Sequence, residues 1–164
     1  MLKPVQSKAA RARGGTFAIV ASKYNALYVD AMVKAAQREF KRAGATVRVI
    51  RVPGAFEIPA VAAVIAAGNT QHATRPAAIL CFGVIFQGQT SHAQHISWGV
   101  THALAGIQVQ HAIPVIHGVF VFDEKDHARV RCLGKTHNRG TEAAQTALEI
   151  AKVMSRVKAE MLKC

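Results

Sequence analysis

The 164-residue sequence has no hydrophobic run long enough to cross a membrane. Its longest apolar stretches, residues 58–67 and 76–86, are well short of the ~20 residues that a membrane-spanning helix needs. The first 15 residues are basic, but no apolar segment of about 7–15 residues follows them to make a signal peptide. We therefore expect a soluble, cytoplasmic protein with no membrane partner.

Cysteine pairs and metal-binding clusters are also missing. The three cysteines, Cys81, Cys132 and Cys164, are far apart, which excludes a disulfide framework and a CxxC metal or redox pair and predicts free thiols. Three histidines, at positions 92, 95 and 102, share one side of a predicted helix, but no carboxylate lies near them in the sequence to complete a metal site. The sequence therefore predicts that no metal is bound.

Charged residues of either sign are absent from residues 76–122. This run includes a whole predicted helix, 90–110, whose polar residues are only His, Gln, Ser and Thr. A helix on the outside of a sheet normally shows water a charged face, so we expect this helix to pack against other copies of the chain. The prediction is a homo-oligomer, and the alternative is a mildly polar helix exposed to solvent.

The whole chain, in contrast, carries a net charge of +12, which favours an anionic partner. The cations are spread over several predicted helices and both ends of the chain. Aromatic residues make up only 6% of the sequence and offer few platforms for stacking on single-stranded bases. We therefore expect a phosphorylated small molecule rather than nucleic acid.

Short apolar runs alternate with segments of helical periodicity along the rest of the chain. The predicted strands are 16–21, 47–52, 77–86 and 113–122, and the predicted helices are 22–44, 56–67, 90–110, 124–133 and 141–161. This alternation is typical of a parallel sheet covered on both faces. We predict a single α/β domain over residues 16–164, a three-layer α/β/α sandwich with a four-stranded parallel sheet, preceded by a basic N-terminal arm of residues 1–15.

Residues 83–92, Gly-Val-Ile-Phe-Gln-Gly-Gln-Thr-Ser-His, lie where a predicted strand gives way to a helix, at the sheet edge where α/β proteins bind ligands. Gly88 permits close approach of a ligand, and a helix N-terminus suits a phosphate; a plain N-cap without a ligand is the alternative. The segment nearly matches the loop GxxxxGK[ST], but Gln89 replaces the lysine, so we do not expect an NTPase. His92 is the best candidate for proton transfer.

Two other charged features accompany this turn. Glu57 lies just after Pro53-Gly54, where it either complements a helix dipole or accepts hydrogen bonds from hydroxyl groups of a ligand. A basic cluster follows the last strand and is either a solvated helical face or an anion site; it comprises Arg129, Arg131, Lys135 and Arg139.

Four segments occur in the order and spacing of a known family. They are residues 22–25 (Ser-Lys-Tyr-Asn), residues 52–59 (Val-Pro-Gly-Ala-Phe-Glu-Ile-Pro), residues 88–92 (Gly-Gln-Thr-Ser-His), and Arg131 with residues 135–144 (Lys-Thr-His-Asn-Arg-Gly-Thr-Glu-Ala-Ala). Over residues 17–154 the chain resembles the 6,7-dimethyl-8-ribityllumazine synthase family.

The resemblance implies a flavodoxin-like fold assembled into pentamers, or into multiples of pentamers up to a hollow shell, with active sites between neighbouring subunits. It implies a transferase of riboflavin biosynthesis that joins 5-amino-6-(D-ribitylamino)uracil to 3,4-dihydroxy-2-butanone 4-phosphate, without a cofactor or metal. It also suggests riboflavin synthase as a partner. A non-catalytic flavin-binding, lumazine-binding or shell-forming member of the same fold is the alternative.

The resemblance also assigns roles to residues. His92 takes the place of the proton-transfer residue. The substrate-binding positions it implies are Tyr24, Asn25, Ala55, Phe56, Glu57, Val84 and Ile85 around the pyrimidine and ribityl chain, Gln89, Thr90 and Arg131 at the phosphate, and Lys135 and Arg139 near the site.

The chain departs from the family pattern at several positions. Gln87 stands where many relatives have Arg or Lys, and Ala93 where an aromatic residue is usual. His117 occupies a position near the pyrimidine that is commonly Phe, and Phe120, Val121 and Phe122 replace a more polar stretch. These changes leave the phosphate turn and His92 intact, so they bear on substrate affinity more than on the type of reaction.

Overall fold

The computed structural model describes residues 15–68 and 75–163. Most of the predicted basic arm, the segment 69–74 between the second predicted helix and the third predicted strand, and Cys164 lie outside the described residues. The predicted arm and its boundary with the domain therefore stay predictions. Within the described residues, no helix is long and apolar enough to cross a membrane.

Four strands form one parallel sheet, as predicted. They are β1 (Thr16–Ser22), β2 (Thr46–Val52), β3 (Ile79–Phe86) and β4 (Val115–Phe122). Their order in space is β2-β1-β3-β4, and all three neighbouring pairs are parallel. All four strands therefore end at the same edge of the sheet, which becomes the place to look for a site.

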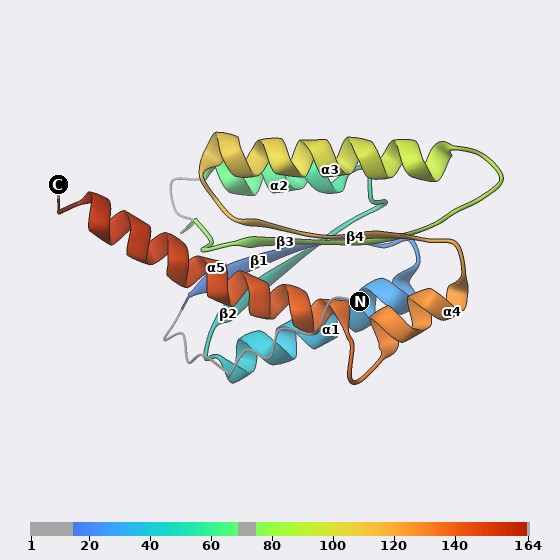
Figure 1. Ribbon diagram of the computed structural model, residues 1–164, viewed down its shortest axis with the longest axis horizontal. Coiled ribbons are helices and arrows are strands. Elements are labelled where there is room, and N and C mark those ends of the chain that lie inside the picture. Colours follow the sequence, from blue (N-terminus) through green and yellow to red (C-terminus); the bar gives the residue numbers. More distant parts are fainter. Residues whose placement is uncertain (1–14, 69–74, 164) are drawn as a thin grey trace.

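Helices cover both faces of this sheet and complete the predicted three-layer α/β/α sandwich (Figure 1). The helices α1 (Ala26–Arg42) and α5 (Arg139–Met161) lie on one face, and α2 (Ile58–Ala67) and α3 (His92–His111) on the other. The helix predicted at 124–133 is a short α4 (Lys125–Ala128) followed by a π-helical turn, η1 (Arg129–Leu133). The fold class is confirmed, and only element boundaries differ from the prediction.

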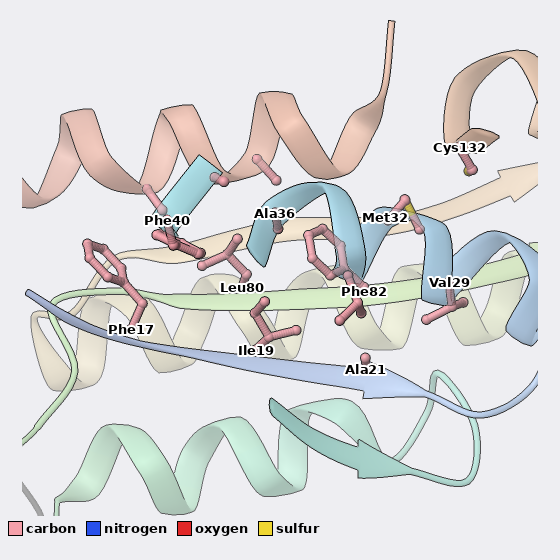
Figure 2. Close-up of a cluster of buried hydrophobic side chains, with 14 of the residues drawn as sticks. Phe17, Ile19, Ala21, Val29, Met32, Ala36, Phe40, Leu80, Phe82 and Cys132 are labelled. Carbon is pink, nitrogen blue, oxygen red and sulfur yellow. The ribbon is translucent and has the colours of Figure 1, made fainter. Parts of the chain in front are cut away.

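Each face of the sheet buries its own apolar cluster, because successive side chains of a strand point to opposite faces. Ile19, Leu80 and Phe82 belong to the cluster under α1 and α5, which Figure 2 shows, whereas their neighbours Val20 and Cys81 pack under α2 and α3. In the first cluster the rings of Phe17 and Phe40 stack, with centroids 4.5 Å apart. The core fixes where each strand ends.

The start of α5 packs directly on the backbone of α1. A Cβ atom added at Gly140 would overlap the backbone of Met32. Asn138 caps the helix, since its side-chain oxygen accepts from the Gly140 N–H at 2.9 Å while its Nδ2 donates to the Cys132 carbonyl at 2.5 Å. The Asn138 hydrogen bonds and the close approach of Gly140 to Met32 hold the segment 131–139 in place. This segment carries Arg131, Lys135 and Arg139.

Candidate active site

The loops that follow β1 and β2 are joined at the carboxyl edge of the sheet. Ser22 and Val52 are partners in the register of the two strands. Immediately after them, the Lys23 N–H donates to the Val52 carbonyl at 2.8 Å and the Tyr24 N–H to the Pro53 carbonyl at 3.2 Å. Two segments that the sequence separates by about thirty residues thus form one surface.

Tyr24 and Glu57 lie on either side of Gly54. The Gly54 N–H donates to Glu57 Oε2 at 2.8 Å, and a Cβ atom at Gly54 would come within 3.2 Å of ring carbon Cδ2 of Tyr24. The Tyr24 ring is 71% exposed and therefore offers an open face beside a carboxylate. Both predicted roles for these residues, stacking and accepting hydrogen bonds, are compatible with this geometry.

Phe56 extends this surface toward α3. Its ring is 62% exposed and lies against Gly99, where an added Cβ would be 3.3 Å from Phe56 Cε2. Ala55, in contrast, is buried beneath it. No local sequence pattern indicates that Gly54 lies beside the Tyr24 ring or Gly99 beside the Phe56 ring, because these contacts join segments that are distant in the sequence.

Asn25 ties this surface to β3. It has a left-handed backbone, with φ of 56°, and its Nδ2 donates to the Val84 carbonyl at 2.7 Å. Val84 is buried and Ile85 is half-buried. Val84 and Ile85 are the residues predicted to contact the pyrimidine through their backbone. The Val84 carbonyl already accepts a hydrogen bond from Asn25, so Ile85, which is less buried, is the more accessible of the two.

The turn between β3 and α3 is held by Gln87. Its Nε2 donates to the carbonyls of Gly88 and Thr90, at 3.0 and 2.8 Å, and its backbone N–H donates to Phe122 of β4 at 2.9 Å. Gln87, which stands where many relatives have Arg or Lys, therefore fixes the conformation of this turn.

The start of α3 faces solvent behind this turn. Gln89, Thr90 and His92 are exposed, and the N-cap residue Ser91 makes no side-chain capping bond. The first N–H groups of the helix thus include donors that an anion can use, beside an accessible imidazole.

His117 lies apart from this surface. It is on β4, an edge strand, and pairs with Cys81, five residues before the last residue of β3. Its Nε2 is 2.9 Å from the Thr101 hydroxyl of α3, a partner that the sequence did not indicate. Although His117 is exposed on one side, packing against α3 partly desolvates the ring and lowers its pKa, against a smaller opposite effect of a backbone hydrogen bond.

The basic residues after β4 form a second separate group. Arg131 and Lys135 are exposed and have no ion pair in the part of the chain that the structure describes. Arg139 is paired with Glu142 at 2.6 Å, and its guanidinium carbon lies 5.6 Å from the Phe120 ring centroid. Of the four predicted basic residues, Arg131 and Lys135 are therefore the two that no ion pair engages.

Metal and thiol chemistry find no support in the described residues. Across residues 15–68 and 75–163, no group of three or more His, Cys, Asp or Glu side chains could hold a metal ion, and His102 donates from Nδ1 to the Trp98 carbonyl at 2.8 Å. Cys81 and Cys132 are free, as predicted, and burial raises their pKa values to about 12 and about 11. Both thiols are thus neutral and enclosed.

A hollow of about 320 Å³ lies at the opposite edge of the sheet, between the strand starts and the last turns of α5, and contains none of the predicted site residues. The predicted site on the single chain is therefore an open surface. Contacts join Tyr24, Glu57 and, through Asn25, Val84. The turn with Gln89, Thr90 and His92 lies at the same edge of the sheet, and His117, Arg131 and Lys135 lie on other elements.

The fold and this surface define an α/β protein with an open aromatic platform and an exposed helix N-terminus at the carboxyl edge of its sheet. Residues 14–155 match the family model of 6,7-dimethyl-8-ribityllumazine synthase. The chain belongs to the 6,7-dimethyl-8-ribityllumazine synthase family, the transferases that serve riboflavin biosynthesis.

Curated relatives with that name are similar over nearly their whole length. One from Stenotrophomonas maltophilia (strain R551-3) is 36% identical over 144 residues, covering 86% of this chain and 90% of the relative. One from Xanthomonas campestris pv. campestris (strain B100) is 36% identical over 141 residues, covering 84% and 88%. One from Xanthomonas oryzae pv. oryzae (strain PXO99A) is 37% identical over 141 residues, covering 84% of this chain and 88% of the relative.

Proposed function

We propose that this lumazine synthase condenses 5-amino-6-(D-ribitylamino)uracil with 3,4-dihydroxy-2-butanone 4-phosphate at a site that two copies of the chain share. The observation that carries the proposal is the division of the site residues into two groups. Tyr24, Glu57 and His92 belong to loops at the carboxyl edge of the sheet, whereas Arg131 and Lys135, the cations expected at the substrate phosphate and near the site, lie beyond β4. A neighbouring copy supplies the missing half of each site.

The pyrimidine substrate lies on the surface formed after β1 and β2. The exposed Tyr24 ring stacks on the pyrimidine, and Phe56 and Ala55 line its edge. One oxygen of Glu57 is held by Gly54, so the carboxylate is oriented to accept hydrogen bonds from ribityl hydroxyls. His117 of the neighbouring copy forms the opposite wall with an imidazole ring.

The phosphate of the second substrate lies at the turn before α3. Gln89 and Thr90 present this turn, and the helix N-terminus favours a negative charge. Arg131 of the neighbouring copy reaches the phosphate with a planar guanidinium, and Lys135 adds a second positive charge. Arg139, engaged with Glu142 and Phe120, contributes charge near the site rather than a direct contact.

His92 moves the protons of the condensation. An amine of the pyrimidine attacks the ketone, water leaves as the Schiff base forms, phosphate is eliminated, and the second amine closes the ring with loss of a second water. Each step transfers protons between nitrogen, oxygen and carbon, which an exposed imidazole beside the turn can mediate near neutral pH. Alignment of two reactants supplies the rest of the rate enhancement.

The outer face of α2 and α3 supports assembly of several copies. Trp98, Val109 and Val64 on these helices are 70%, 81% and 69% exposed, on a helix pair that carries no charged residue. Such a face is stable in water when another copy covers it. The assembly is a pentamer or a multiple of pentamers that works in the cytoplasm, with riboflavin synthase as its partner.

Turnover by the purified protein tests the reaction, with lumazine absorbance and phosphate release followed together. We expect His92→Ala to lower turnover about 10²- to 10⁴-fold, because proton transfer by a positioned group contributes that much. His95→Ala, an exposed histidine one turn further along α3, is the matched control and should keep turnover. Product binding without turnover in the unsubstituted protein would refute the catalytic proposal.

A further inference from the structure

The fold gathers positive charge at one end of the molecule. We call this end the amino-terminal pole: it is where the strands begin and where α1, α3 and α5 end. Hydrogen bonds join its parts, since the Thr46 N–H donates to the Gly15 carbonyl, the Ala77 N–H to the Thr16 carbonyl, and the Arg75 side chain to the His111 carbonyl. The hollow places Met154 and Lys158 of α5 beside the same strand starts.

Nine of the described cations lie at this pole, against three carboxylates, Glu39, Glu149 and Glu160. The cations are Arg38, Lys41, Arg42, Arg48, Arg75, Lys152, Arg156, Lys158 and Lys163. The remaining described residues carry eight cations against six carboxylates. Charges that are dispersed along the sequence thus converge on one surface.

Most of these cations are available to a partner. Only Arg42 and Lys152 form ion pairs within the described part of the chain, with Glu39 and Glu149. The other cations spread from the end of α1 across β2 to the end of α5, which is wider than a single phosphate needs. The synthase site uses the opposite end of the molecule, so its chemistry does not account for this charge.

We propose that the amino-terminal pole binds the phosphate backbone of a nucleic-acid duplex without regard to base sequence. A broad surface of exposed cations matches a regular array of phosphates. The exposed aromatic side chains among the described residues, Tyr24, Phe56 and Trp98, lie on other parts of the surface, so the pole offers no ring for stacking on single-stranded bases.

An anionic membrane is the competing partner, because Val157, Met161 and Leu162 are exposed at the end of α5. Interfacial binding depends on one amphipathic helix lying in the surface with its apolar side. Here the cations belong to α1, β2 and the segment before β3 as well as to α5. This distribution favours a charged surface that follows a duplex.

The test measures binding of a fluorescent duplex of about 30 base pairs, as DNA and as RNA, at several salt concentrations. We compare Arg156→Gln/Lys158→Gln with the matched control Lys34→Gln/Lys125→Gln, which removes two exposed cations outside the pole. Loss of two phosphate contacts should lower the slope of log affinity against log salt by about 1.8 and weaken binding tens-fold near 0.1 M salt. The control should keep the slope, and both variants should keep synthase activity.

Four results would overturn the proposal. One is the absence of duplex binding at low salt, and another is an equal slope for the two variants. The third is displacement of the duplex by the butanone phosphate, which would place the contact at the catalytic turn instead. Retention on vesicles of anionic phospholipid without binding of the duplex would assign the pole to a membrane and equally contradict it.

Discussion

Asn25 illustrates how one residue shapes the substrate surface twice. Its left-handed backbone, with φ of 56°, turns the chain after β1, and its side chain holds the Val84 carbonyl. Asparagine tolerates this conformation better than residues with larger or apolar side chains do. The orientation of the neighbouring Tyr24 ring therefore depends on a residue that need not touch the pyrimidine.

We predict that Asn25→Gly and Asn25→Ala separate these two contributions. Glycine keeps the backbone conformation and loses the hydrogen bond, so the KM for the pyrimidine should rise while the free energy of unfolding falls by about 0.5–1.5 kcal/mol. Alanine loses both and should cost about 1–2 kcal/mol more. Steady-state kinetics and urea unfolding check this, and equal stability of the two variants would contradict it.

His117 provides a pH-dependent contribution to stability. Partial burial lowers its pKa in the folded protein, so the unfolded chain binds more protons below the ordinary histidine value of about 6.5. Stability from this residue is therefore present at higher pH and is lost as the pH falls through that value.

We predict that His117→Phe makes the unfolding temperature less sensitive to acidification. Between about pH 7.5 and 5.5 the unsubstituted protein should lose more stability than the variant, because phenylalanine cannot take up a proton. Scanning calorimetry across this range measures the difference. Parallel curves for the two proteins would exclude a role for His117.

At the scale of the elements, the sequence predicted the sheet better than the turns. The runs predicted at 16–21 and 77–86 form β1 and most of β3, because they are largely apolar and buried on both faces of the sheet. The helix predicted from residue 22 begins at Ala26, because Ser22 ends β1 and residues 23–25 form a turn that hydrogen-bonds to the loop after β2. The helix predicted at 124–133 is interrupted by a π-helical turn, for which periodicity gives no signal.

Some site residues could be recognised from local sequence patterns, whereas contacts between distant segments could not. Glu57 and His92 could be singled out because each follows a glycine turn at the end of a strand. The proximity of Tyr24 to Gly54 and of Phe56 to Gly99 depends on packing between distant segments. Likewise, no local pattern shows that Thr101 is the partner of His117.

The contact between α1 and α5 leads to a prediction for Gly140. An added Cβ would meet the Met32 backbone, which cannot move aside as a flexible side chain can. We expect Gly140→Ala to destabilise the protein by about 1–3 kcal/mol. The control is Gly106→Ala on α3, where the added Cβ meets nothing within 4 Å. Denaturant unfolding compares them, and equal stability would contradict the contact.

At the scale of the whole molecule, the two ends of the sheet have different character. The carboxyl edge carries the aromatic platform and the turn proposed to bind phosphate, and the amino-terminal pole carries six of the eight excess cations of the described residues. The face of α2 and α3 between them is uncharged. We propose that an assembly of several copies covers this face. In that assembly, Arg131 and Lys135 of one copy lie beside the platform of the next.

Mixing two inactive variants tests that claim most directly. His92→Ala removes the proton-transfer residue from the half that carries the platform and the turn, and Arg131→Ala removes the phosphate contact that the neighbouring copy supplies. Each protein alone should have little activity. In rings assembled from equal amounts, about one site in four combines two intact halves, so refolding them together should restore about a quarter of the activity. Activity no higher than the mean of the separate proteins would show that each chain holds a complete site and would contradict the account.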